Sequence, residues 1–369
     1  MPNLFVVPIE PIEERYSTQW LKWFKKELEQ ADVFKSVIYV DPKPISEEIS
    51  NGEFLDVTGT NYYKASQLQI LMTYLHTGAI QKGDIIFFLD YWFPGVEMLA
   101  YVRDGMNLGF KIAGCLHAGT WDPEDFLSHK GMERWARNVE QSWLDIADLI
   151  FVATDFHRHL IRSARDVTPG KIKVTGFPLY EETINPNGYH PGDQRKTLTV
   201  VFPHRLAPEK DPELFDALKQ EWRRESNQGN FPNVKSFKFI KTKDNYQGKA
   251  NYYDILKSSI FAISFAKQET WGIAMQEAVL CGCIPIVPDR LSYSELYLDC
   301  FKYTAQLGAN GSTKRSMILS NVLQRMKNFW ATDSMYLQEK WKAQKYLIKQ
   351  KGEAAIPLMI QHLLQDLQR

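Results

Sequence analysis

The sequence has few cysteines, no long hydrophobic run and no leader-like start. Its 4 cysteines among 369 residues lack the spacing of a disulfide framework or a zinc site, so we expect reduced structural thiols and no bound metal. The longest apolar runs, 84–89 and 259–266, are far shorter than the roughly 20 residues that a membrane-spanning helix needs. The first residues have neither the basic nor the apolar stretch of a signal peptide. These absences predict a cytoplasmic protein with no membrane span.

The net charge is zero because 44 basic side chains balance 44 acidic ones, but the two signs are unevenly distributed. Residues 1–200 contain 20 lysines and arginines against 27 aspartates and glutamates, whereas the remainder contains 24 against 17. Most of the basic excess falls in 314–351. Two explanations are open: solvated helix faces, or an anionic partner attracted to the second half.

Short apolar strands alternate with amphipathic helices along the chain, which predicts an α/β fold with parallel sheets. In the first half we predict strands at 4–7, 37–40, 84–89, 111–116, 149–152 and 171–174. In the second half we predict strands at 198–202, 236–240, 261–265 and 284–287. Helices are expected at 17–30, capped by Ser17, and at 67–75, 131–145, 212–228, 250–257, 271–280 and 313–369.

The polar segment 180–197, with repeated proline and glycine, is the expected linker between two domains. We predict an N-terminal Rossmann-like domain at 1–185 and a C-terminal one at 196–345, with their parallel sheets facing each other across a cleft. The helix at 346–369 is expected to pack back toward the N-terminal domain. Ligands of such folds bind at the carboxyl ends of the strands, which directs attention to the loops that follow them.

The strongest local signal is a pair of glutamates, Glu269 and Glu277, with a glycine and a helix start between them. A helix start offers free N–H groups and a positive dipole end to a diphosphate, and the glycine lets a phosphate approach the backbone. The residues expected to present these N–H groups are Trp271, Gly272 and Ile273. Glu277 can accept hydrogen bonds from ribose hydroxyls, and Glu269 can do the same for the sugar. Surface glutamates on an ordinary helix are the alternative.

A companion segment, 202–215, contains Arg205 and Lys210. Together the two segments resemble the Glu-x7-Glu and GRL-x-x-EKG motifs of retaining GT-B glycosyltransferases, the family-4-like group. The resemblance implies that Arg205 and Lys210 hold the donor phosphates, arginine through paired hydrogen bonds and lysine as a point charge. Two glycines of the family's loop are His204 and Asp211 in this sequence.

In the first half, the resemblance implies acceptor-side residues at strand ends. His117 follows a buried strand, where family members often carry a histidine that faces the reacting sugar, so a catalytic role is predicted for it together with Glu269. Asp122 lies in the same segment. Asp90 follows another buried strand, where a turn or cap role is equally open, and Asp155 lies in a segment similar to one that lines the cleft floor in the family.

The first turn departs most from the family, which often has a glycine-rich loop there. In its place stand three polar candidates for the acceptor side: Glu10, Arg15 and Tyr16. Helix capping and surface charge are the alternatives for these residues. His157 and His159, on a later helix, are expected to be structural.

The resemblance implies a retaining, metal-independent glycosyltransferase that uses a nucleotide-sugar, with UDP as the expected nucleotide and no further cofactor. Catalysis would rest on positioning and charge stabilisation. The opening segment and 117–123 also look similar to phage-encoded glycosyltransferases, some of which modify hydroxymethylated pyrimidines in DNA. The favoured acceptor is therefore 5-hydroxymethylcytosine or hydroxymethyluracil in double-stranded phage DNA, in the host cytoplasm. Alternatives are a lipid, polysaccharide or small-molecule acceptor, an epimerase-like enzyme, and a non-catalytic nucleotide-binding protein.

Overall fold

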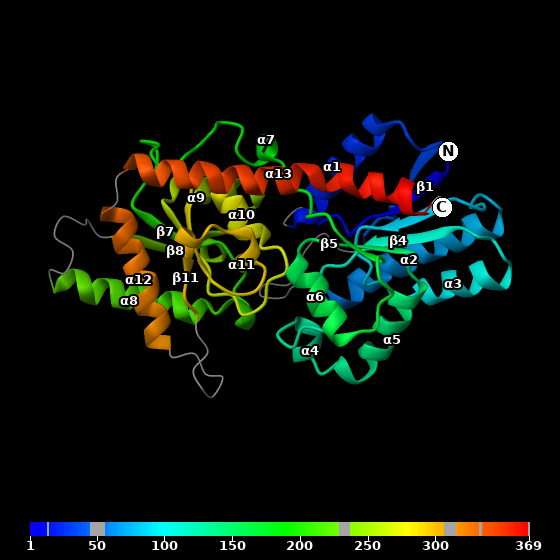
Figure 1. Ribbon diagram of the computed structural model, residues 1–369, viewed down its shortest axis with the longest axis horizontal. Coiled ribbons are helices and arrows are strands. Elements are labelled where there is room, and N and C mark those ends of the chain that lie inside the picture. Colours follow the sequence, from blue (N-terminus) through cyan, green and yellow to red (C-terminus); the bar gives the residue numbers. More distant parts are fainter. Residues whose placement is uncertain (13–14, 45–55, 229–236, 306–314, 332–333, 368–369) are drawn as a thin grey trace. The chain divides into compact units, whose positions relative to one another are not determined.

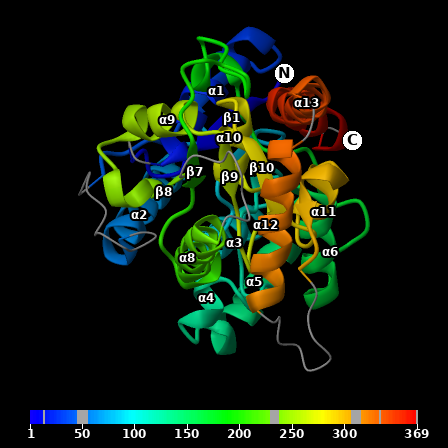
Figure 2. The ribbon, with the colours of Figure 1, turned by 90° about the vertical axis from the view of Figure 1, so that its left-hand side faces the viewer.

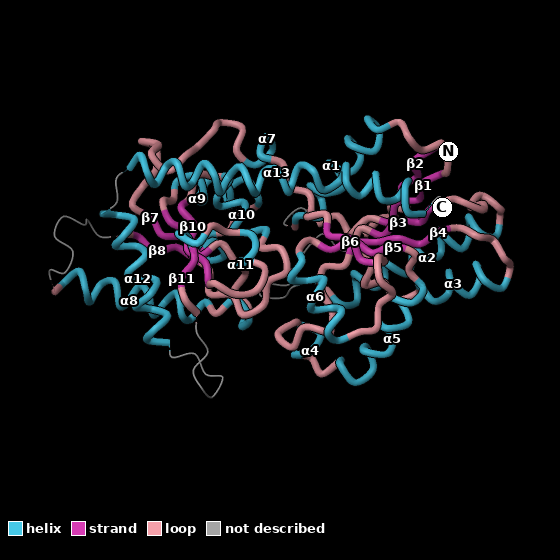
Figure 3. The backbone as a smooth tube through the Cα atoms, in the orientation of Figure 1, coloured by secondary structure: helices cyan, strands magenta, loops and turns pink. Residues whose placement is uncertain are grey.

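The computed structural model describes residues 1–12, 15–44, 56–228, 237–305, 315–331 and 334–367. The chain divides into two compact units, which we call unit 1 (Met1–Pro178 with Glu353–Arg369) and unit 2 (Leu179–Gly352). Each unit contains one sheet with helices on both of its faces (Figure 1), and the strands of the two sheets stand out in Figure 3. The α/β class is therefore confirmed.

Unit 1 contains a six-stranded sheet in the order β2-β1-β3-β4-β5-β6, in which all recorded strand pairs are parallel. Its strands are β1 (Asn3–Val7), β2 (Ser36–Tyr39), β3 (Ile85–Phe88), β4 (Lys111–Cys115), β5 (Leu149–Val152) and β6 (Ile172–Val174). β3 and β5 are buried at every position, because helices cover both of their faces. The direction in which strands are added reverses between β1 and β3, so the loops after these two strands diverge there, at the usual ligand position of such sheets.

One face of this sheet is covered by α1 (Tyr16–Ala31) and by the end of α13 (Ser334–Leu367). Phe24 of α1 meets Phe87 of β3 edge-on, with ring centroids 5.8 Å apart, and Met359 of α13 contacts Cys115 of β4. The opposite face is packed against the apolar sides of three helices, α2 (Val57–His76), α3 (Val96–Gly105) and α5 (Glu133–Ile146). Two further helices of unit 1 are α4 (Phe126–His129) and α6 (Asp155–Ala164).

Unit 2 contains a five-stranded sheet in the order β11-β10-β9-β7-β8, again with parallel pairs. Its strands are β7 (Thr199–Phe202), β8 (Lys238–Lys241), β9 (Phe261–Ile263), β10 (Ile284–Pro288) and β11 (Lys302–Tyr303). α8 (Pro212–Asn227) and α12 (Arg315–Ala331) lie side by side on one face (Figure 2), whereas α9 (Lys249–Ser258) and α10 (Ile273–Leu280) cover the other. The remaining elements are α7 (Glu181–Ile184), α11 (Tyr293–Leu296) and the 3₁₀ turns η1 (Pro208–Lys210), η2 (Thr242–Asn245) and η3 (Asp299–Phe301).

Several helices differ from the sequence-based predictions. α1 begins at Tyr16, and Ser17 does not cap it: the Ser17 hydroxyl donates to the Glu10 carbonyl at 2.8 Å, which ties the preceding turn to the helix. α2 begins at Val57, ten residues before the predicted start, because Asp56 caps it by accepting from the Thr58 N–H at 3.0 Å. α3 was not predicted. Residue 236 of the predicted strand 236–240 and parts of the predicted helical tail 313–369 lie outside the described residues.

The predicted linker 180–197 packs within unit 2. Asn185 is buried, and its amide donates to the carbonyls of Tyr189 at 3.0 Å and Leu280 at 2.8 Å. All 4 cysteines are free, and burial raises the pKa of Cys283 to about 11. Across the described residues, no helix combines the length and the hydropathy required to cross a bilayer.

Candidate active site

The loops after β7 and β9 meet in unit 2, because these neighbouring strands flank the point where the strand order reverses. The His204 ring, two residues beyond β7, lies with Nε2 2.9 Å from Oγ of Ser264, which is one residue beyond β9. Ser264 Oγ also lies 3.0 Å from the Tyr293 hydroxyl. A buried polar chain therefore holds the two loops together.

The N-terminus of α10 depends on Gly272, which has a φ of +75° and caps the helix. This is the left-handed region, which glycine adopts at little cost. A Cβ atom at this position would stand 2.9 Å from Cε1 of the fully buried Tyr293. The helix proper begins at Ile273 and not at the predicted residue 271, and Trp271 is buried just before it.

Glu269 lies between this helix start and Lys210. One of its oxygens accepts from the Gly272 N–H at 3.0 Å, and the other lies 3.1 Å from Lys210 Nζ. The lysine also donates to the Gln268 carbonyl. Burial by itself raises the pKa of Glu269, but the Lys210 charge and the Gly272 hydrogen bond outweigh burial and lower the pKa. The Glu269 side chain is thus an ionised acceptor in contact with both halves of the predicted phosphate site.

Arg205 comes from the same loop as Lys210 and pairs with Glu209, one turn further along. The Nε atom of Arg205 lies 3.0 Å from Glu209 Oε1. Burial raises the pKa of Glu209, but the adjacent guanidinium outweighs this and the net pKa is lowered. About a third of the Arg205 side chain is exposed (31%), so the guanidinium is open to an anion from solvent.

The two departures from the family's glycines have visible structural reasons. Asp211 has a φ of 54°, the same left-handed region that a glycine would adopt, and its carboxylate accepts from the Leu214 N–H at 3.2 Å to cap α8. His204 is buried against Ser264. Burial, reinforced by the Lys210 charge, lowers the pKa of His204 to about 3, so the ring is neutral. Asp211 thus supplies the left-handed turn of the loop, and His204 fixes the loop through its buried contact with Ser264.

Glu277, on the second turn of α10, is held by α9. Its Oε1 atom accepts from Lys249 Nζ at 2.7 Å and from the Tyr253 hydroxyl at 2.8 Å. Only 2% of the Glu277 side chain is exposed. Sequence reasoning missed Lys249, because no local pattern connects the first residue of one helix to an acid of another.

Within unit 2 the structure therefore brings together Arg205, Lys210, Glu269, Gly272 and the start of α10. Helix N–H groups, a guanidinium and an ammonium are the groups that bind phosphates in proteins. Ionised carboxylates beside them can accept hydrogen bonds from sugar hydroxyls. Among the residues that the structure describes, no group of three or more His, Cys, Asp and Glu side chains could hold a metal ion.

In unit 1, the predicted catalytic histidine lies at the carboxyl ends of β3 and β4. His117 Nε2 lies 2.7 Å from the Leu89 carbonyl, and Nδ1 lies 3.2 Å from the Tyr16 hydroxyl. Because a carbonyl only accepts, Nε2 carries the proton and Nδ1 accepts from Tyr16. Burial lowers the pKa of His117, against the opposing charge of Asp90, which agrees with a neutral ring. Trp20 packs beside the ring, with centroids 5.0 Å apart.

Two other predicted acceptor-side residues take part in the turns around this histidine. Glu10 is buried, and its carboxylate accepts from the Thr60 hydroxyl at 2.7 Å. Arg15 precedes Tyr16 and occupies the N-cap position of α1 with an extended backbone, without a side-chain cap hydrogen bond. Glu10 and Arg15 thus stand on either side of the turn from which Tyr16 reaches His117.

Asp90 has the turn role that sequence reasoning left open. Its carboxylate accepts from the Trp92 N–H at 3.2 Å and pairs with Lys64 at 3.3 Å. Asp122 is buried and accepts from the Glu124 N–H at 3.0 Å. Asp155 is about half exposed (54%) and forms an ion pair with Arg158 on its own helix. Tyr16 is recorded in direct hydrogen-bond contact with His117.

A buried network that sequence reasoning missed fixes the loop after β4. Glu140 of α5 accepts from the Thr120 N–H at 2.8 Å and from the Trp92 indole N–H at 3.0 Å. Its second oxygen accepts from the Thr120 hydroxyl and pairs with Arg165, both at 2.6 Å. Glu140 is 1% exposed, so this carboxylate is compensated by four hydrogen bonds. Glu140 of α5 therefore anchors the loop that carries His117.

Comparisons with known proteins were made for sequence and for structure. The sequence matches no family model. It is similar to a tRNA-queuosine alpha-mannosyltransferase from Drosophila melanogaster, with 29% identity over 138 residues that cover 33% of this chain and 36% of that protein. The match thus spans about a third of the relative's length.

Several solved structures share the fold along the whole chain. A sucrose-phosphate synthase from Thermosynechococcus elongatus aligns with a TM-score of 0.65 at 12% identity and covers 100% of this chain and 99% of that one. A glycosyltransferase from Rickettsia africae gives a TM-score of 0.63 at 10% identity, covering 100% and 99%. An E. coli structure titled trehalose-6-phosphate, bound with UDP-2-fluoro glucose, gives 0.63 at 11% identity, covering 98% and 99%. These likenesses confirm the predicted GT-B fold with its two parallel sheets.

Proposed function

We propose that this chain is a glycosyltransferase that moves a sugar from a nucleoside-diphosphate sugar to an acceptor hydroxyl. The observation that carries the proposal is the contact of Lys210 with Glu269, whose other oxygen binds the N–H of Gly272 at the start of α10. This arrangement lies at the strand-order reversal of unit 2, where α/β sheets bind ligands. The fold is that of solved glycosyltransferases, one of which carries a UDP-sugar analogue.

In this proposal the diphosphate binds to Arg205, Lys210 and the start of α10, where Trp271 and the cap residue Gly272 precede Ile273. Glu277 accepts hydrogen bonds from the ribose, and Glu269 binds the sugar. UDP is the proposed nucleotide, because solved structures with this fold are in complex with UDP or bound with UDP-2-fluoro glucose.

The proposed reaction breaks the bond between the anomeric carbon and the diphosphate oxygen and forms a bond from that carbon to the acceptor oxygen. The acceptor proton passes to the departing diphosphate. Two cationic side chains and the helix start neutralise the charge that develops on the diphosphate, which is the electrostatic stabilisation that such a reaction needs. We propose retention of the anomeric configuration and independence of metal ions, with the neutral His117 as the unit 1 group that contacts the reacting sugar.

For the acceptor we propose a hydroxyl on a modified nucleoside of tRNA. The supporting observation is the similarity to a transferase named for tRNA-queuosine over a third of the chain. The Tyr16 ring at the start of α1 and the His117 ring beyond β4 offer aromatic surface to a base. The hydroxymethylated pyrimidines of DNA, to which the opening segment of the sequence pointed, are the second acceptor and share the chemistry of a hydroxyl on a base.

The test is incubation of the purified chain with UDP- and GDP-sugars and three acceptors: bulk tRNA, hydroxymethylated DNA and plain DNA. Nucleosides are then analysed by mass spectrometry, and NMR of the product reports the anomeric configuration. We expect a hexose mass increase on a tRNA nucleoside; an increase on DNA alone would replace tRNA as the acceptor. Release of free or epimerised sugar without a glycoside would instead favour the epimerase-like enzyme.

Two variants connect the activity to the site. Arg205→Ala is expected to abolish donor use, because it removes a phosphate ligand. Arg224→Ala is the matched control, since Arg224 also pairs with a nearby glutamate but lies on the exposed side of α8. Equal turnover in the two variants would refute the donor site.

A further inference from the structure

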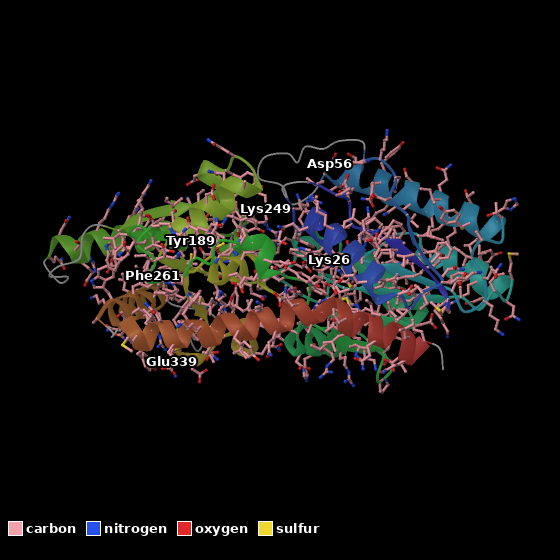
Figure 4. All side chains as sticks on the ribbon, turned by 90° about the horizontal axis from the view of Figure 1, so that it is seen from above. Lys26, Asp56, Tyr189, Lys249, Phe261 and Glu339 are labelled. Carbon is pink, nitrogen blue, oxygen red and sulfur yellow. The ribbon has the colours of Figure 1, made fainter. Side chains whose placement is uncertain are left out.

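We propose that Lys249 is a positioning residue for donor binding, which holds the Glu277 carboxylate in the orientation that accepts hydrogen bonds from the ribose of a nucleoside diphosphate. The inference rests on the proposed function and adds a residue to it. Lys249 is the first residue of α9 (Figure 4), and its ammonium lies 2.7 Å from Glu277 Oε1.

The burial of Glu277 makes a partner cation necessary. The side chain is 2% exposed, and it lies on α10, whose residues from Met275 to Leu280 are all buried. An ionised carboxylate in such surroundings is strongly disfavoured unless a cation and hydrogen bonds compensate it. Lys249 is the cation recorded in contact with it, and it is 18% exposed, so that it remains accessible from solvent.

The rings of α9 fix the ammonium as well as the carboxylate. Lys249 Nζ lies 4.7 Å from the ring centroid of Tyr252 and 4.9 Å from that of Tyr253. The Tyr253 hydroxyl donates to the same Oε1 atom that Lys249 contacts, at 2.8 Å. Burial raises the pKa of Tyr252, reinforced by the Glu277 charge, so this phenol stays protonated beside the carboxylate.

This geometry suggests different hydrogen-bond partners for the two carboxylate oxygens of Glu277. The hydrogen bonds recorded from Lys249 and Tyr253 both fall on Oε1, and the Tyr252 hydroxyl also hydrogen-bonds the Glu277 carboxylate. A carboxylate has about four lone-pair sites over its two oxygens, so Oε2 is the atom that we assign to the ribose hydroxyls. Without the ammonium, the carboxylate loses the contact that orients it. Ribose binding then weakens, while phosphate binding at Arg205 and Lys210 is untouched.

The test compares two probes on the full chain by isothermal titration calorimetry. The first probe is UDP or GDP, whichever binds the unmodified protein more tightly, and the second is inorganic pyrophosphate, which has no ribose. We expect Lys249→Met to raise the Kd for the nucleotide by about tenfold, the loss of one hydrogen bond to a charged group, with the Kd for pyrophosphate unchanged. Lys249→Arg keeps the charge and is expected to restore most of the nucleotide affinity.

Two controls make the result specific. Lys257→Met lies on the same helix, and Lys257 also stands over Tyr253, at 5.9 Å, but it pairs with Asp254 and not with Glu277; we expect its nucleotide affinity to be unchanged. In a Glu277→Gln background, Lys249→Met should add no further loss. Equal losses for the nucleotide and for pyrophosphate, or unchanged nucleotide affinity in Lys249→Met, would overturn the inference. A wild-type chain that binds neither nucleotide would overturn the proposed function itself.

Discussion

Replacing Gly272 by alanine perturbs the start of α10 in two ways that the structure separates. The first is backbone conformation: a φ of +75° is left-handed, which costs a non-glycine residue about 1–2 kcal/mol. The second is contact: the new Cβ would stand 2.9 Å from Cε1 of Tyr293. That ring is fully buried and bonded to Ser264, so it cannot turn away freely. Overpacking of this kind costs about 1–3 kcal/mol more.

Gly188→Ala is the matched control in the same unit. Gly188 has a φ of +65°, and no atom lies within 4 Å of the place where its Cβ would stand. It therefore carries the conformational cost without the contact. For a unit of this size, each kcal/mol corresponds to about 2–4 °C of melting temperature, so Gly272→Ala is expected to melt roughly 2–12 °C below Gly188→Ala.

The assay is thermal unfolding followed by circular dichroism, together with calorimetric titration of the nucleotide that binds the wild-type chain. We expect the lower melting temperature and a loss of nucleotide affinity in Gly272→Ala, and intact affinity in Gly188→Ala. Equal melting temperatures in the two variants would refute the claim that Tyr293 packs against the helix start. Intact nucleotide affinity in Gly272→Ala would refute the placement of the diphosphate there.

Three further predictions concern charge. Lys210→Met is expected to raise the Kd for the nucleotide at least about tenfold by removing a charged phosphate ligand; calorimetry measures this, and an unchanged Kd would contradict it. Glu140→Gln breaks the buried ion pair with Arg165 and is expected to lower the free energy of unfolding of unit 1 by about 3 kcal/mol. Urea unfolding measures this loss. A loss below about 1 kcal/mol would show that the network is dispensable. Burial and Lys210 lower the pKa of His204 from 6.5 to about 3. Below pH 6.5 the unfolded chain therefore binds a proton at His204 that the folded chain does not bind. The free energy of unfolding consequently falls as the pH drops from 6.5 toward 3. His204→Asn should make the melting temperature less dependent on pH over that range, and an unchanged slope would show that His204 does not contribute.

The strands that are buried on both faces were predictable because such burial requires a continuous apolar run, whereas the two-residue strand β11 was not predicted. β3 and β10 are buried at every position and match their predicted ranges to within one or two residues. The start of α2 was not predictable from periodicity, because Gly59 and the surrounding polar residues carry no helical apolar pattern. Its capping aspartate, Asp56, was the available signal, and it stands eleven residues before the periodic part begins.

The contacts within the site depended on tertiary structure that local sequence does not encode. Arg205, Lys210 and Glu269 were singled out by sequence, and Lys210 and Glu269 are in contact. Lys249 is 28 residues from Glu277 in sequence, and nothing in the sequence around Lys249 indicates which acid it meets. For the same reason, the sequence did not indicate that Arg165 is the partner of Glu140.

The basic excess of the second half also depends on partners that sequence alone does not reveal. Several of these cations are compensated within unit 2, in the pairs Arg315 with Asp211, Lys327 with Glu225, and Lys345 and Lys349 with Glu181. Since these cations have carboxylate partners within their own unit, the excess is weaker evidence for an anionic partner than the composition suggested.

The last helix has a consequence for biosynthesis. α13 contributes its first part to unit 2 and its last part to unit 1, where Met359 reaches Cys115 of β4 and Asp366 pairs with Lys173 of β6. A ribosome delivers the N-terminal end first, so the first sheet emerges long before the helix that covers it. We expect the nascent chain to wait with the part of that face over β4 and β6 uncovered, since α1 covers only the other part, and to complete its first unit only after the second has been synthesised.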